Sequence, residues 1–182
     1  MELLRQSALS VYDEYENFDE TGRAAELQIV RILANSDISD TAKYETEETY
    51  EANIISRVIS LAGAAPEANG EPEHCEGTAA ELLLVSIWTS RTGNASEGVG
   101  VSKACFLGLI DALDIDRYVL QPVVSNTFGF VEYSDTISSS LGKSNNSTYF
   151  LVNAWVQLIW SFNFATSETK AILITRRGPS DP

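Results

Sequence analysis

The stretch Tyr149–Phe164, with the sequence YFLVNAWVQLIWSFNF, is the longest apolar segment of the chain, and Lys170–Arg177, KAILITRR, follows it closely. Branched and aromatic side chains of this kind favour β-strands. Polar residues interrupt the first stretch at Asn153, Gln157 and Asn163. It is therefore too short and too polar to span a bilayer. We expect both segments to form strands at the carboxyl end of a β-rich domain.

Five further segments combine branched or aromatic residues with alternation of apolar and polar positions, which predicts strands. One of them, Tyr44–Leu61, is expected as a strand because of its β-branched content, but a helix from Glu47 onward remains open. Pro122 requires a kink or an edge position in another. The five segments are Leu27–Leu33, Tyr44–Leu61, Leu82–Thr89, Tyr118–Val124 and Thr127–Tyr133.

Helical spacing occurs in two places. In residues 1–18 the apolar side chains recur every three or four residues, which predicts an amphipathic helix. Ser102–Leu113 shows similar spacing, with Ser102 as the expected N-cap. Between the predicted elements lie two long loops, 62–78 and 134–148, and a glycine-rich turn at 90–100.

These elements predict a mainly β fold, since the strands are not separated by regular crossover helices. We expect a single antiparallel β-sandwich or jelly roll of about eight strands, with an N-terminal helix and one or two short helices in loops. A length of 182 residues suits one hydrophobic core. The expected division is an N-terminal helical arm, 1–20, followed by a single jelly-roll domain, 21–182. Strand order and oligomer symmetry stay open.

The chain is acidic, with 26 Asp and Glu against 12 Lys and Arg and a formal net charge of −14. Only four of the bases are lysines, and residues 1–20 contain a single base, Arg5. Proteins that bind the phosphate backbone need a basic stripe. We therefore expect no direct contact with nucleic acid. A carboxylate-rich surface is favourable where salt screens the repulsion between charges.

The densest carboxylate group in the apolar half consists of Asp111, Asp114 and Asp116. Oxygen clusters bind Ca²⁺, but this run lacks the glycine and distal glutamate of an EF-hand. Two carboxylates could also serve acid–base hydrolysis. The third interpretation is a solvated helix end that pairs with Arg117. The three aspartates are thus weak candidates for a metal site.

No catalytic or cofactor-binding signature is found, so we expect a non-enzymatic protein without a cofactor. The single histidine, His74, lies in a loop beside Cys75. Cys75 and Cys105 are the only cysteines; whether they form a disulfide is left open. The segment Gly98–Lys103 departs from both phosphate-binding glycine patterns and is expected to be a hairpin turn.

Aromatic residues are concentrated in the apolar strands. They could form a stacking platform for sugars, but core or subunit-interface positions are the more common use of such residues. The residues concerned are Trp88, Tyr149, Phe150, Trp155, Trp160, Phe162 and Phe164.

The size, the acidic and lysine-poor composition and the strand density from Leu27 to Arg177 resemble a family of structural subunits. They are similar to the small major capsid proteins of icosahedral haloarchaeal viruses with an internal membrane, which are built on a single jelly roll. The acidic segment Met1–Glu20 agrees with a shell protein that does not touch the genome. An acid content of 26 in 182 is modest for a halophile.

The resemblance implies a capsid protein located in the virion and assembled in the host cytoplasm. Its expected partners are further copies of itself and a second major capsid protein in pseudo-hexameric capsomers, close to an internal viral membrane. Sheet edges and the two long loops are the expected contacts. The alternatives are a carbohydrate-binding β-sandwich, another virion component such as a spike, tail or head-completion protein, and a hydrolase centred on the three aspartates.

Overall fold

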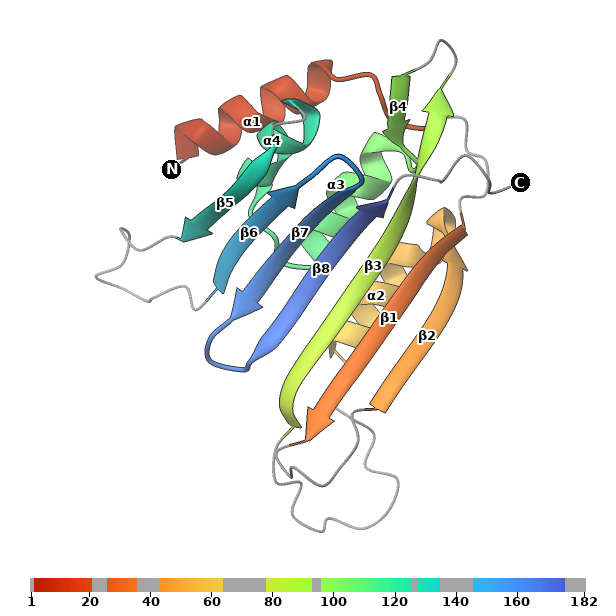
Figure 1. The fold of residues 1–182 in the computed structure, drawn as a ribbon, viewed down its shortest axis with the longest axis vertical. Coiled ribbons are helices and arrows are strands. Elements are labelled where there is room, and N and C mark those ends of the chain that lie inside the picture. The colour runs from red at the N-terminus through yellow and green to blue at the C-terminus, as the bar shows by residue number, and fades with distance from the viewer. Residues whose placement is uncertain are drawn as a thin grey trace.

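The computed structural model describes residues 2–20, 26–35, 43–63, 78–92, 96–125, 128–134 and 146–175 (Figure 1). The helices are α1 (Glu2–Glu14), α2 (Glu51–Gly63), α3 (Lys103–Ala112) and α4 (Leu120–Ser125), and the 3-10 helix η1 (Arg117–Val119) directly precedes α4. The strands are β1 (Glu26–Asn35), β2 (Lys43–Tyr50), β3 (Thr78–Thr92), β4 (Ser96–Val99), β5 (Gly129–Ser134), β6 (Asn146–Val152), β7 (Val156–Asn163) and β8 (Glu168–Thr175).

These strands form one mixed sheet in the order β2-β1-β3-β8-β7-β6-β5, with the short β4 paired to β3. All neighbours are antiparallel except β3 and β8, which are parallel. Along the strand order, the amino half of the chain therefore supplies β2, β1 and β3, and the carboxyl half supplies β8, β7, β6 and β5. They meet at β8, the central strand, while β2 and β5 form the two edges.

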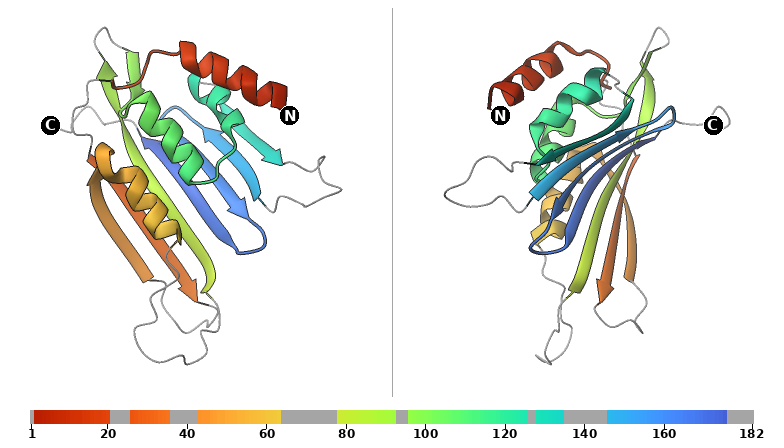
Figure 2. Two further views of the ribbon diagram at one scale, coloured as in Figure 1. Left: turned by 180° about the vertical axis from the view of Figure 1, so that it is seen from behind. Right: turned by 60° about the vertical axis from the view of Figure 1, so that its left-hand side comes forward.

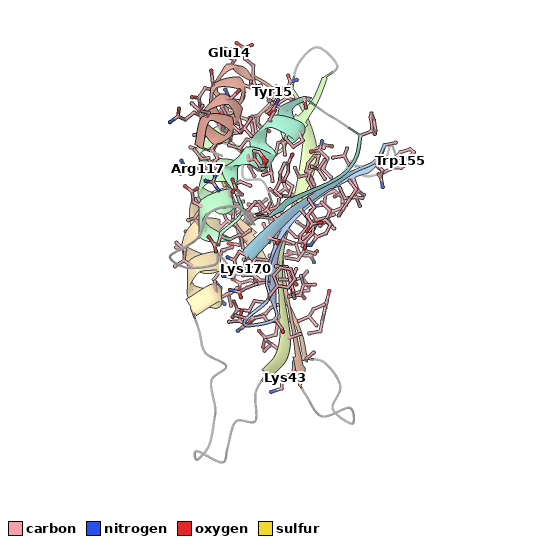
Figure 3. All side chains as sticks on the ribbon, turned by 90° about the vertical axis from the view of Figure 1, so that its left-hand side faces the viewer. Glu14, Tyr15, Lys43, Arg117, Trp155 and Lys170 are labelled. Carbon is pink, nitrogen blue, oxygen red and sulfur yellow. The ribbon has the colours of Figure 1, made fainter. Side chains whose placement is uncertain are left out.

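The described helices all lie on one side of this sheet (Figure 2). Seen edge-on, the helices form one layer, and side chains project from the opposite side of the sheet with no described element over them (Figure 3). The architecture is thus two layers, one of strands and one of helices.

Alternation of side chains along each strand places every second residue under the helices. Directly opposed residues of five strands form a row there: Ile29, Val85, Ile172, Ile159 and Phe150, each at most 1% exposed. This row, which we call the central row, is the floor of the hydrophobic core, and α1, α2, α3 and α4 contribute its roof.

The N-terminal segment belongs to this core. Tyr12 of α1 and Phe18 pack edge to face with ring centroids 5.2 Å apart, and Phe106 of α3 completes the aromatic cluster. The backbone then runs beside β4, where a Cβ at Gly98 would lie 2.4 Å from the carbonyl oxygen of Asn17. Only glycine allows this approach. The described part of the expected arm, residues 2–20, is therefore packed into the common core.

The mainly β fold with eight strands and an N-terminal helix is confirmed, as is the helix in 102–113. Ser102 is its N-cap and accepts a hydrogen bond from the backbone N–H of Cys105. The prediction of a hairpin turn at Gly98–Lys103 is wrong: Gly98 and Val99 end strand β4, Ser102 is the N-cap of α3, and Lys103 is its first residue. The expected topology differs, however. The described strands form one open sheet with a parallel pair, instead of the two facing antiparallel sheets of a sandwich or jelly roll.

The prediction of a strand at Tyr118–Val124 is wrong: this segment forms η1 and α4. The side chain of Asp116 accepts a hydrogen bond from the N–H of Tyr118 and so starts a helical turn. Pro122 falls in the first turn of α4, where its missing N–H costs no helical bond. The segment Tyr44–Leu61 divides at Tyr50 into the strand β2 and the helix α2.

Most of the two expected loops, 64–77 and 135–145, lies outside the described residues. The longest described helices, α1 and α2, have 13 residues each. Within the described part of the chain, no helix has both the length and the apolar character needed to cross a membrane.

The central row generates a stability prediction. Phe150→Ala should lower the free energy of unfolding by about 3–5 kcal/mol, because it leaves a cavity in a fully buried position. Leu151→Ala is the matched control, since Leu151 points to the opposite face and is 36% exposed; it should cost less than about 1 kcal/mol. Urea unfolding followed by circular dichroism measures both. Equal losses would contradict the assignment of the two faces.

Candidate functional site

A polar cleft of about 180 Å³ lies where α1, the end of α3 and the strands β5 and β6 meet. Three parts of the chain that are distant in sequence line it. Its residues are Arg5, Asp114, Ile115, Asp116, Tyr133, Asn146 and Thr148.

Asp116 is the most constrained residue of the cleft. Arg5 binds its carboxylate with two nitrogen atoms: Nε lies 3.0 Å from Oδ1, and Nη2 lies 2.5 Å from Oδ2. The backbone N–H of Asp116 donates to Oγ1 of Thr148 at 3.0 Å. The residue thus joins α1 and β6 to the beginning of η1.

Electrostatics explain the ionisation of this carboxyl. Burial by itself would raise the pKa of Asp116. The hydrogen bonds from Arg5 and from the N–H of Tyr118, with the positive charge of Arg5, outweigh burial and hold the pKa of Asp116 below its ordinary value. The pKa of Tyr133 is raised by burial and, secondarily, by Tyr118 and Asp116. The charged carboxylate is therefore an ion-pair partner more than a proton donor.

Of the three sequence-predicted aspartates, Asp114 and Asp116 line the polar cleft, whereas Asp111 does not. Asp111 lies on α3 and forms an exposed ion pair with Arg117, with Nη2 2.7 Å from Oδ2. Asp114 follows α3 with a positive φ of 53° and accepts a hydrogen bond from Asn146. Among the described residues, no three His, Cys, Asp or Glu side chains are grouped to hold a metal ion. The predicted pairing with Arg117 is confirmed for Asp111, whereas Asp114 and Asp116 have other partners.

The residues that give the cleft its character were missed by sequence reasoning. Arg5 is 111 positions from Asp116, and Thr148 and Asn146 are 32 positions from their aspartate partners. No local pattern connects such distant positions. The only signal was that Arg5 is the single base among the first 20 residues.

Cys105 is buried as a free thiol in the core, on α3. Burial, and secondarily the carboxylate of Glu51, raises the pKa of Cys105 to about 12. A thiol with this pKa is a poor nucleophile because the thiolate is the reactive form. Cys75 and the neighbouring His74 lie outside the described residues.

The second candidate site is the side of the sheet away from the helices, which we call the open face. It contains one row of directly opposed residues, one from each strand. It also contains the residues two and four positions before and after that row in each strand, because alternate side chains point to the same face. The row consists of Thr46, Val30, Leu84, Ala171, Trp160, Tyr149 and Glu132.

Large apolar side chains of the open face are exposed. They occur on both edges and in the middle of the sheet, and no described helix or strand covers them (Figure 3). Soluble monomers rarely expose a contiguous apolar patch of more than a few hundred Å². The most exposed are Tyr44 (64%), Phe130 (57%), Tyr50 (53%), Trp88 (39%) and Leu151 (36%).

On the β5, β6 and β7 half of the open face, three aromatic rings contact one another. Tyr149 stacks on Trp160 with ring centroids 5.1 Å apart, and Phe130 lies 6.2 Å from Tyr149 and 6.1 Å from Trp160. Glu132 is directly opposite Tyr149 in the register of β5 and β6. This half of the face is therefore a flat aromatic surface with one carboxylate at its edge.

Comparison of the chain with protein-family models, with curated proteins and with solved structures finds no match.

The Arg5–Asp116 pair predicts a pH dependence. Because the pKa of Asp116 is lower in the folded than in the unfolded chain, the pair stabilises the fold above the ordinary value of 3.8. This stabilisation is lost as the pH falls below 3.8 through the folded pKa. Asp116→Asn should be less stable than the native chain near neutral pH, and the difference should shrink below 3.8.

Urea unfolding at a series of pH values measures this difference. Asp111→Asn is the control, because its exposed pair with Arg117 should contribute at most about 1 kcal/mol. A stability difference between the Asp116→Asn protein and the native chain that stays constant down to the acid transition would contradict the assigned role of Asp116.

Proposed function

We propose that this chain is a structural subunit that assembles by burying its open face against another protein surface. The observation that carries the proposal is the exposure of Trp88, Phe130 and other large apolar side chains on one continuous side of the sheet. Burial of apolar area is the main favourable term in protein association. The described helices lie on one side of the sheet, and among the described residues the second side is left for that purpose.

The assembly that the composition favours is the capsid of an archaeal virus, with a second, jelly-roll subunit as partner over an internal membrane. One further feature supports a shell component that does not contact the genome. The single base of residues 1–20, Arg5, forms an ion pair with Asp116, so its charge is already neutralised within the protein and does not attract phosphate. The proposal rests on the open face and on charge, since the described sheet is not a jelly roll.

A second candidate, carbohydrate binding, is favoured by the stacked rings of Phe130, Tyr149 and Trp160 beside Glu132. Sugars pack their apolar faces on aromatic rings and need a polar group nearby.

Assembly should strengthen with salt. A net charge of −14 opposes association, and raising the salt from roughly 0.1 to 3 M shortens the screening length from about 10 Å to less than 3 Å. We expect the molar mass from light scattering to rise above the monomer value of 19.9 kDa along this series. Trp160→Glu, which places a charge in the middle of the open face, should remain monomeric throughout. A native chain that is monomeric at every salt concentration would contradict the proposal.

The carbohydrate alternative has its own test. Titration with soluble oligosaccharides should change tryptophan fluorescence saturably if Trp160 binds sugar, and Tyr149→Ala should abolish the change because it removes the stacked neighbour of Trp160. Phe164→Ala, outside this cluster, is the control. A native chain that shows no saturable response to any sugar would count against this second function.

A further inference from the structure

The open face differs from one half of the sheet to the other. On the side of β7, β6 and β5 it carries the bulky rings of Trp160, Tyr149 and Phe130. In the rows of these three rings, β3 and β1 hold smaller side chains, including Ser86 and Val30, and Ala171 lies between the halves on β8. The large side chains of the β2, β1 and β3 half, Tyr44, Tyr50 and Trp88, lie in other rows. Within one row, bulky side chains on one half and smaller ones on the other form a surface that can fit a rotated copy of itself.

We propose that the open face pairs with the open face of a second copy of this chain, giving a two-fold symmetric β-sandwich with β8 along its axis. This proposal rests on the proposed function, because it names the partner of the same surface. β8 is the middle strand of the seven-strand order. A two-fold axis parallel to it places β7 over β3 of the second copy, β6 over β1, and β5 over β2.

The area of the open face supports a second copy of the chain as the partner. Seven strands about 4.8 Å apart, each about seven residues long at about 3.3 Å per residue, give a face of roughly 800 Å². A stable protein–protein interface buries about 800 Å² on each side. Two such sheets would pack about 10 Å apart, with their strands within about 30° of parallel. The open face is therefore large enough for a stable dimer without any other contact.

The few charged side chains of the open face also support a second copy as the partner. Among the side chains that the structure describes, the open face carries no Lys or Arg and two carboxylates, Glu48 and Glu132, both on edge strands. They would lie at the solvated rim of a dimer. The axis along β8 places Glu132 opposite Thr46 of the second copy, because both belong to the same cross-strand row. Two identical faces therefore meet without a buried charge and without opposed carboxylates.

Packing follows from the same symmetry. Trp160 lies opposite Leu84 of the second copy, and Leu158 lies opposite its Ser86, since each pair occupies one row on the two sides of β8. Large side chains thus meet smaller ones. The β7, β6 and β5 half of each chain covers the β3, β1 and β2 half of the other, and the dimer has two equivalent contacts of this kind, as a two-fold interface requires.

Sedimentation equilibrium tests the proposal. At high salt, where the repulsion between the two negative chains is screened, the native chain should have twice the mass of the 19.9 kDa monomer. Leu158→Glu should weaken the dimer at least about 100-fold, because two carboxylates would be buried in the interface. Ile59→Glu is the matched control: Ile59 is 57% exposed on α2, on the helix layer, so the same substitution there should leave the dimer intact. Circular dichroism verifies that both variants fold.

Cross-linking tests the axis. In a background with Cys75→Ser, Leu173→Cys lies on the central strand and on the open face, so a short bismaleimide should join the two copies efficiently. Lys170→Cys, on the same strand but on the helix side, should not be joined.

The outcomes separate the two proposals. An oligomer that depends on Leu158 but has an odd number of copies, or that is not joined at position 173, would overturn the two-fold pairing and leave the proposed function standing. A monomer, or an oligomer that is indifferent to Leu158→Glu, would overturn both.

Discussion

The alternation of side chains in a single sheet is the constraint on which the rest of this structure depends. The central row, from Ile29 through Ile172 to Phe150, is fully covered because the helices lie over that side. The residues between them in each strand must then point the other way. Since those residues are also largely apolar, a strong core on one side produces an exposed apolar surface on the other.

The acidic residues have two roles around this sheet. Some fix the helix layer: Glu20 accepts a hydrogen bond from the N–H of Lys103, and Glu51 accepts one from the N–H of Ser102, so both carboxylates lie at the positive end of the α3 dipole. Others lie on the edge strand β2, with the sequence KYETEETY. Charge on an edge strand discourages edge-to-edge pairing. This charge agrees with our proposal that association uses the open face instead of the sheet edge.

The residues of the polar cleft connect the helix layer to the sheet. The Arg5–Asp116 ion pair and the hydrogen bond from the N–H of Asp116 to Thr148 connect α1, η1 and β6, while Tyr12 donates a hydrogen bond to the carbonyl oxygen of Lys103. These contacts hold the N-terminal helix on the sheet. They explain why carboxylates that are close in sequence, Asp111, Asp114 and Asp116, have three different partners.

The sequence by itself determined most of the strands, the helix that Ser102 caps and the pairing of Asp111 with Arg117, because period-two alternation, capping and short-range ion pairs are local. It misassigned Tyr118–Val124, where branched residues favour a strand but the cap at Asp116 starts a helix. Only the tertiary structure decided that the strands form one sheet with a parallel centre, that Arg5 reaches Asp116, and that no described element covers one side of the sheet. Those features depend on contacts between residues far apart in the chain, which no local pattern encodes.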